Sequence, residues 1–276
     1  MRLDAHQHFW QFDPVRDAWI NEDMVAIKRD FMPADLKPVL VANNVDGCIA
    51  VQADQSEIET AFLLNMADEN RWIKGVVGWV DLLRNDLSDR LNHYKANRHF
   101  KGVRHILQAE ASGFMAQTDF IKGVAEVGRQ ELSYDILTNE KQLDEVIELI
   151  EKLPAMRLVI DHISKPDIKS QSFDHWAKSM KKISAFDHVY VKLSGMVTEA
   201  DWKDWSLSDL EPYVHFCLEH FTASRLMFGS DWPVSLLAGS YNEVINVLSD
   251  SIAELSPSEQ QQVMGATATE FYQLSE

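Results

Sequence analysis

Short apolar runs rich in β-branched residues recur along the whole chain, and segments with helical periodicity lie between them. At residues 144–153 and 205–221, apolar positions recur every three or four residues, which is the spacing of a helix with one buried face. The short runs are typical of strands that are buried on both sides. The expected strands are residues 2–8, 45–52, 74–80, 102–107, 132–137, 157–162, 189–193 and 226–229.

A strand followed by a helical segment, repeated eight times, is the pattern of a closed parallel barrel. We therefore predict an α/β fold, a single (β/α)8 barrel of the TIM type, with a doubly wound open sheet as the alternative architecture. No composition break, internal repeat or linker rich in Pro, Gly or Ser divides the chain. Residues 1–276 are therefore expected to form one domain, a usual length for such a barrel.

The connection between the first two expected strands is long, and its first part is aromatic and irregular. It contains Phe9, Trp10, Phe12 and Trp19. Long connections are commonly functional, and this one begins at the C-terminal end of a strand. Two interpretations stay open, a wall or lid over a site and a packing loop that covers the barrel rim.

The charge and cysteine content narrow the classes of partner. The formal net charge of −17 leaves no basic surplus to neutralise phosphates, which argues against nucleic acid and anionic membranes. Cys48 and Cys217 are far apart in apolar surroundings, as expected of reduced core residues. No apolar segment approaches a membrane span and no hydrophobic signal region is visible, so we expect a cytoplasmic protein. No assembly signal stands out, and the oligomeric state stays open.

Polar side chains gather where the expected strands end. In a (β/α)8 barrel these ends surround one mouth, so the residues there meet at one site. Because side chains alternate along a strand, only one of Arg104 and His105 can point inward. The polar residues at the strand ends are His6, His8, Gln52, Asp81, Arg104, His105, His162, Lys165, Lys192, Ser194 and Asp231.

The first strand contains the motif Asp4-Ala5-His6-Gln7-His8. Strict alternation would direct Asp4, His6 and His8 to the same face. Two imidazoles at this spacing can hold a divalent cation or a polarised water between them. The alternative is a pair of solvent-facing histidines on an edge strand.

Taken in chain order, the motifs resemble the amidohydrolase superfamily, and within it the amidohydrolase-related branch of L-fuconolactone and L-rhamnonolactone hydrolases. The resemblance covers essentially the full length. It departs from the branch at residues 265–272, where Gly-Ala-Thr-Ala-Thr-Glu-Phe-Tyr replaces an ending that packs the last helix. The motifs are His6-x-His8, Lys-Gly-Val-Arg-His-Ile-Leu-Gln at 101–108, Val-Ile-Asp-His at 159–162, Val-Lys-Leu-Ser-Gly at 191–195 and Phe-Gly-Ser-Asp-Trp-Pro at 228–233.

The resemblance implies a metal-assisted hydrolase. Many amidohydrolases hold two metals with a histidine on the fifth strand, but residues 132–137 contain none, so we expect one divalent ion, zinc or similar. The implied ligands are His6, His8, His162 and Asp231. Asp231 would accept a proton from the attacking water. The branch also includes lactonases that need no metal, in which His162, Arg104 or His105 would stabilise the oxyanion.

The resemblance also implies a small-molecule substrate, a sugar lactone cleaved in carbohydrate catabolism. A neutral lactone with many hydroxyls is recognised by polar side chains and aromatic faces. The candidates for substrate contact are Trp10, Gln52, Asp81, Lys165, Lys192, Ser194 and Trp232. Three alternatives stay open: a metal-dependent decarboxylase, a pyrone dicarboxylate lactonase, which needs two or more arginines at the mouth, and a barrel that only binds a ligand.

Overall fold

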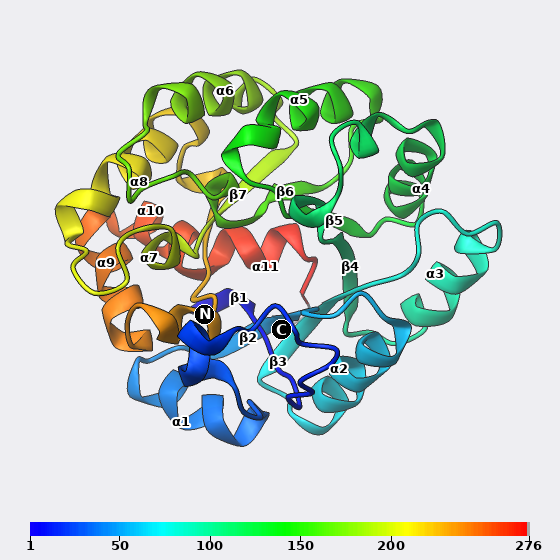
Figure 1. Cartoon of the computed structure of the whole chain (residues 1–276), viewed down its shortest axis with the longest axis horizontal. Coiled ribbons are helices and arrows are strands. Elements are labelled where there is room, and N and C mark those ends of the chain that lie inside the picture. Colours follow the sequence, from blue (N-terminus) through cyan, green and yellow to red (C-terminus); the bar gives the residue numbers. More distant parts are fainter. Residues whose placement is uncertain (275–276) are drawn as a thin grey trace.

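The computed structural model describes residues 1–274 and contains one sheet of eight parallel strands in sequence order, surrounded by helices (Figure 1). The His8 amide donates to the Trp232 carbonyl at 2.7 Å, and the Asp231 amide donates to the His6 carbonyl at 2.8 Å. These bonds join the end of the first strand to the segment after the last, so the sheet closes. The predicted (β/α)8 barrel is confirmed, and the open-sheet alternative is wrong. The strands are β1 (Leu3–Gln7), β2 (Gly47–Val51), β3 (Ile73–Gly78), β4 (Phe100–His105), β5 (Ser133–Ile136), β6 (Leu158–Ile160), β7 (Val189–Leu193) and β8 (Leu226–Phe228).

Helices follow the strands around the outside of the barrel. The helix expected at residues 205–221 begins at Leu207, because Ser206 caps it and donates its amide to the Asp209 carboxylate at 2.8 Å. In the described part of the chain, no helix is long and apolar enough to cross a membrane. The α-helices are α1 (Pro33–Ala42), α2 (Glu57–Glu69), α3 (Leu87–Lys95), α4 (Thr118–Arg129), α5 (Leu143–Lys152), α6 (Asp174–Ser184), α7 (Met196–Glu199), α8 (Leu207–Phe221), α9 (Tyr241–Ser251), α10 (Pro257–Gln261) and α11 (Thr267–Phe271).

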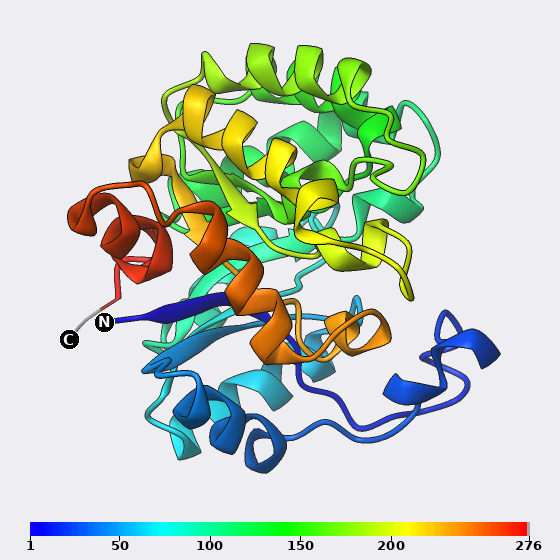
Figure 2. The same ribbon diagram turned by 90° about the vertical axis from the view of Figure 1, so that its left-hand side faces the viewer.

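The apolar core has two parts. The larger lies between the strands and the surrounding helices. The smaller fills the barrel interior and consists of Leu3, Ala5, Ile49, Val51, Val77, Val159, Met227, Ala268, Phe271 and Tyr272. The last three belong to α11 and the residue that follows it, so the C-terminal helix covers the end of the barrel at which the strands begin. Figure 2 shows this helix, in red, on the same side as the N-terminus. Residues 275–276 of the expected domain lie outside the described part.

The long connection after β1 lies at the opposite end of the barrel, where it projects in blue in Figure 2. Its base is packed as core, since Trp10 and Phe31 exchange backbone hydrogen bonds of 3.0 and 2.8 Å and both are buried. Its outer part includes a 3-10 helix at Glu22–Ile27 and the exposed side chain of Val15. This connection therefore stands beside the mouth formed by the C-terminal ends of the strands.

Candidate active site

A β-bulge in β1 directs both histidines of the first motif into the barrel. Asp4 pairs with Cys48 and Gln7 pairs with Ala50, so three steps along β1 face two steps along β2. The additional residue resets the alternation of side chains. As a result, Ala5 and the histidine that follows it both face the barrel interior.

The prediction that Asp4 shares a face with the two histidines is wrong. The Asp4 carboxylate accepts hydrogen bonds from the Tyr241 hydroxyl at 3.1 Å, the Ser230 amide at 2.9 Å and the His6 amide at 3.1 Å. Burial raises the pKa of Asp4 to about 6. Asp4 therefore stabilises the bulge from outside the barrel and ties it to the segment that carries Asp231.

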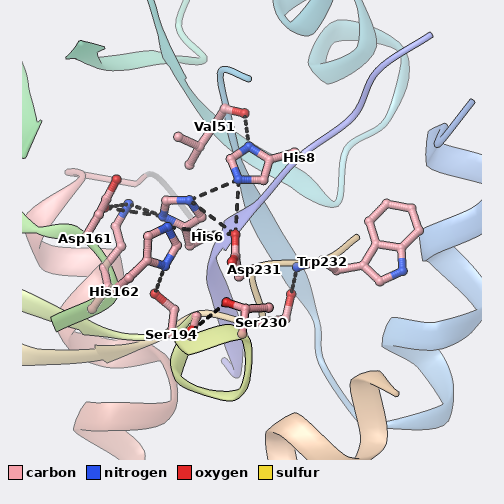
Figure 3. A network of polar contacts seen from close by, with 12 residues as sticks. His6, His8, Val51, Asp161, His162, Ser194, Ser230, Asp231 and Trp232 are labelled. Atoms are coloured by element: carbon pink, nitrogen blue, oxygen red, sulfur yellow. Dashed lines mark hydrogen bonds and ion pairs between the residues drawn. The ribbon is translucent and has the colours of Figure 1, made fainter. Parts of the chain in front are cut away.

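Three potential metal-ligand atoms converge at the bottom of the mouth (Figure 3). His6 Nε2 and His8 Nε2 are 3.2 Å apart, and Asp231 Oδ1 lies 3.3 Å from His8 Nε2 and 4.0 Å from His6 Nε2. His162 Nε2 is 3.8 Å from the same oxygen. Tetrahedral ligands at roughly 2.0–2.2 Å from zinc lie about 3.3–3.6 Å from one another. The ligand atoms of His6, His8 and Asp231 therefore fit a single small divalent cation, whereas His162 groups with His6 and Asp161.

The protonation of the histidines also suits a cation. His8 Nδ1 donates to the Val51 carbonyl at 2.8 Å, so in neutral His8 the Nε2 lone pair faces the other ligand atoms. Burial, together with Lys192, lowers the pKa of His6 well below its ordinary value, and burial does the same to His162. Neutral imidazole is the form that binds a metal.

Asp231 is ionised in this environment. Burial works to raise its pKa, but His162 and His8 outweigh burial and hold that pKa below its ordinary value. The residue also adopts a left-handed backbone conformation, with φ of 56°. Strained backbone of this kind persists where the surroundings hold it, often at functional sites.

His162 enters the mouth from a left-handed turn. The four residues from His162 to Lys165 all have φ between 44° and 59°, and each left-handed residue costs about 1–2 kcal/mol. Buried contacts hold the turn, since Trp176 Nε1 donates to the Ile163 carbonyl at 2.6 Å and the Ser164 and Thr138 hydroxyls are 2.8 Å apart. The turn follows β6 and places His162 Nε2 3.8 Å from Asp231 Oδ1.

Four charged side chains lie beneath the histidines and are buried inside the barrel. Lys192 Nζ is 2.6 Å from Asp135 Oδ2 and 3.0 Å from Asp161 Oδ1, while Arg104 Nη1 is 3.2 Å from Asp161 Oδ2. These two cations and two carboxylates form one buried ion network directly below Asp231 and the histidines. Asp135 and Asp161 were not predicted from the sequence to belong to the site. A carboxylate within an otherwise apolar strand was the signal for the first.

Arg104 is the inward-facing residue of the pair at the end of β4. His105 points outward, where its Nε2 lies 2.7 Å from Glu110 Oε1 and its ring stacks on Phe114 at 5.3 Å. This follows from the alternation of side chains along a strand. The structure does not bring His105 to the site, so the oxyanion role considered for it is not supported.

A cavity of about 310 Å³ lies above the cluster. Of the candidates for substrate contact, Trp10 and Lys165 line it, together with Trp19 and Gln108, which were not among those candidates. The lining residues are His8, Trp10, Trp19, Ala53, Arg104, Ile106, Gln108, Ala109, Leu137, His162, Lys165, Asp231 and Val234. The candidates that do not line it are Gln52, Asp81, Lys192, Ser194 and Trp232.

These other candidates either form hydrogen bonds or ion pairs with residues of the site or lie away from the cavity. Gln52 Nε2 donates to the Arg104 carbonyl at 3.2 Å, and Ser194 Oγ is 2.9 Å from His162 Nδ1. Trp232 is buried among aromatic rings, and Asp81 accepts from a backbone amide in its own turn. Lys192 belongs to the buried ion network. Direct substrate contact by these residues is therefore not supported.

Glu59 on α2 supports the cavity wall and makes stability depend on pH. Its Oε2 accepts from the Ala53 and Asp54 amides at 2.9 and 2.7 Å, and burial raises its pKa from 4.5 to about 8. Between these values the folded protein binds more protons than the unfolded chain, so the free energy of unfolding falls as pH rises. We expect Glu59→Gln to remove roughly 3–5 kcal/mol of this fall between pH 4.5 and 8.

Urea unfolding of both proteins across this range would measure the effect. Other titrating groups, including Asp4, are common to both proteins and cancel in the difference. A constant difference in unfolding free energy at all pH values would show that Glu59 ionises normally.

Comparisons with known proteins agree with this architecture. The family model for amidohydrolases matches residues 3–274. The chain is 38% identical over 288 residues to a protein named L-fucono-1,5-lactonase from Burkholderia multivorans, with 100% of this chain and 97% of the relative covered. It is 34% identical to a protein of the same name from Burkholderia ambifaria, with 99% and 96% covered.

A solved structure leads to the same family. A crystal structure of an amidohydrolase from B. multivorans with bound zinc superposes with a TM-score of 0.96 at 38% identity and covers 100% of both chains. The resemblance drawn from the ordered motifs is thus confirmed. Because the family model matches residues 3–274 and the two relatives are similar along nearly their whole length, this chain belongs to the amidohydrolase family.

Proposed function

We propose that this protein is a lactonase, a carboxylic-ester hydrolase that opens a sugar lactone such as L-fucono-1,5-lactone by attack of water. The observation that carries the proposal is the convergence of His6, His8 and Asp231 at the bottom of a cavity of about 310 Å³. The relatives named L-fucono-1,5-lactonase support the substrate class. A sugar-lactone substrate supports a role in carbohydrate catabolism, and we propose that the protein acts in the cytoplasm. The single closed sheet supports one catalytic domain.

We further propose that His6, His8, His162 and Asp231 hold one divalent cation. Zinc is the ion in the B. multivorans crystal structure, and the spacing of the His6, His8 and Asp231 ligand atoms suits it. A bound cation would lower the pKa of a water and polarise the lactone carbonyl. The absence of a histidine from β5, where Asp135 pairs with Lys192 instead, supports one ion rather than two.

Asp231 is the general base of the proposed reaction. Its carboxylate is held ionised, lines the cavity and takes a proton from the attacking water. The same group, now protonated, returns the proton to the ring oxygen as the ester bond breaks. Arg104 also lines the cavity, and its guanidinium stabilises the negative charge that develops on the carbonyl oxygen.

The cavity suits a neutral sugar ring. Trp10 and Trp19 form an aromatic side, and Gln108 and Lys165 add hydrogen-bonding groups. Among the described residues, Arg104 is the one arginine that lines the cavity. A dicarboxylate needs at least two such partners, so the lining favours a sugar lactone over a pyrone dicarboxylate.

The test is proton release from a panel of aldonolactones in weak buffer, with zinc-replete and chelated protein. Rapid release from L-fucono-, L-rhamnono- or L-galactonolactone supports the lactonase. Loss of release after chelation, and recovery with zinc, supports the metal. Inactivity on every lactone contradicts the proposal, and release of CO2 from an aromatic acid would identify a decarboxylase instead.

Trp19 tests whether the long connection after β1 is a wall of the site. We expect Trp19→Ala to raise KM about 5- to 10-fold, the effect of roughly 1 kcal/mol of lost aromatic contact, while kcat and Tm stay close to wild type. The side chain is 45% exposed, so its removal opens no core cavity. Steady-state kinetics and thermal unfolding measure both effects.

Val15→Ala is the matched control, because Val15 lies in the same connection, is 85% exposed and does not line the cavity. It should leave KM unchanged. A fall in Tm of Trp19→Ala with an unchanged KM would favour the packing-loop interpretation.

A further inference from the structure

Two side chains that line the cavity carry a permanent positive charge, and each is already paired with a carboxylate. Arg104 Nη1 lies 3.2 Å from Asp161 Oδ2. Lys165 Nζ lies 3.6 Å from Glu199 Oε1. Among the described residues, no other lysine or arginine lines the cavity. Along these walls, a carboxylate on a bound molecule would therefore find no cation that lacks a negative partner.

The pair of Lys165 and Glu199 is fixed by the backbone on both sides. Glu199 ends α7, and its carbonyl accepts a hydrogen bond from the Lys169 amide at 3.0 Å. Lys165 belongs to the left-handed turn after β6, and its amide donates to the His162 carbonyl at 2.8 Å. The two charged side chains are only 23% and 25% exposed. Their charges are therefore screened less than those of an ordinary surface ion pair.

Glu199 stands behind Lys165 as seen from the cavity. It does not line the cavity but a neighbouring hollow of about 540 Å³, which Lys165 does not line. Burial raises the pKa of Glu199, and the Lys165 ammonium opposes that rise and favours the ionised carboxylate. A molecule in the cavity would thus meet an ammonium whose charge is offset by a carboxylate on its other side.

We propose that Glu199 is a specificity-determining residue, which makes the cavity accept neutral lactones and reject lactones that carry an additional ionised carboxylate. The proposal rests on the lactonase function proposed above and assigns one residue to its choice of substrate. Without Glu199, the Lys165 ammonium would bind such a carboxylate by a charge-assisted hydrogen bond. With Glu199 in place, the substrate carboxylate would lose hydration without gaining an unpaired cation, and it would be repelled by the Glu199 carboxylate. Glu199 touches no substrate and acts through Lys165.

The test compares L-galactonolactone with L-galactarolactone, which has a carboxylate in place of a hydroxymethyl group, on zinc-replete enzyme at neutral pH. Wild type should prefer the neutral lactone. We expect Glu199→Gln to raise kcat/KM for the anionic lactone about 10-fold and to keep kcat/KM for the neutral lactone within about 2-fold of wild type. Glutamine keeps the shape of the side chain and still accepts from the ammonium. A merely structural role would lower both values, so it cannot produce a gain on one lactone.

Asp201→Asn is the matched control, because it removes the same charge from the same part of the surface. Asp201 Oδ2 lies 3.0 Å from Lys169 Nζ, and neither residue lines the cavity. The control should keep the substrate preference of wild type. An equal gain on L-galactarolactone in Asp201→Asn would attribute the effect to the net charge of the protein and overturn the proposal.

Combining Glu199→Gln with Lys165→Gln tests the route of the effect. The double variant should lose the gain on the anionic lactone, because no ammonium remains to bind the carboxylate, whereas a gain that persists contradicts the route. A wild type that prefers L-galactarolactone, or a Glu199→Gln variant without the gain, would refute the proposal.

Binding separates this proposal from the lactonase function. If wild type hydrolyses no lactone, the proposed function fails, and calorimetric titration with L-galactarolactone then decides the role of Glu199. Glu199→Gln should bind this lactone about 10-fold more tightly than wild type does. Equal or weaker binding by the variant would overturn the role of Glu199.

Discussion

Asp231→Asn is expected to lower kcat for lactone hydrolysis by about 1,000-fold or more and to leave the fold intact. An amide has the shape of the carboxylate but accepts no proton, so the general base is lost without a change in packing. The backbone bonds of residue 231 to His6 and Ser235 do not involve the side chain and remain. Initial rates of proton release and circular dichroism measure the two effects.

Glu59→Gln is the matched control for this experiment, because it also converts a buried carboxyl to an amide but lies outside the cavity lining. Its kcat should equal that of wild type. The low pKa of Asp231 further implies that kcat stays level from neutral pH to below about 4, the ordinary value for an aspartate. Near-normal turnover in Asp231→Asn would rule out this base.

His6→Ala is expected to lose both the bound cation and activity, with kcat lowered by about 1,000-fold or more. The variant removes one of the three converging ligand atoms. It also removes the only one of these three side chains that contacts Asp161 of the ion network among the described residues. Losing one of few protein ligands weakens metal binding strongly, and an open coordination position cannot replace it. Elemental analysis after gel filtration and the lactone assay measure the two losses.

His105→Gln is the control, since His105 stands at the same end of the barrel but faces outward onto Phe114. Metal content and kcat should match wild type. An active, fully metallated His6→Ala would show that His6 is structural. Full activity of metal-free wild type would instead assign the chemistry to Asp231, His162 and Arg104 alone.

Much of the architecture was predictable from short-range patterns. Each buried strand is a short apolar run, and α5 and α8 have one apolar face, because backbone geometry imposes these periods on neighbouring residues. Once eight such units close into a barrel, their C-terminal ends must surround one mouth. That rule predicted that His6, His8, His162 and Asp231 would meet, although residues 8 and 231 are far apart in the chain.

Predictions for individual side chains failed where local geometry departs from the regular strand. Strict alternation placed Asp4 with the histidines, but the register shift against β2 turns it toward Tyr241. The same rule allowed either residue at the end of β4, and only the position of the strand in the barrel selected Arg104. A bulge is a property of two paired strands, so it has no signature in one strand alone.

By itself, the sequence determined the barrel, the end at which the site lies and the residue types of the ligand cluster. The tertiary structure alone decided which side chains reach the cavity and what holds them. The left-handed turn at His162 depends on Trp176, and the ion network joins Asp135 and Lys192 to Tyr272 at the far end of the chain. The physical reason for this division is that the periodicity of apolar residues reflects only which face of a helix or strand is buried. The partner of a buried charge is set by distances between elements that are remote in sequence.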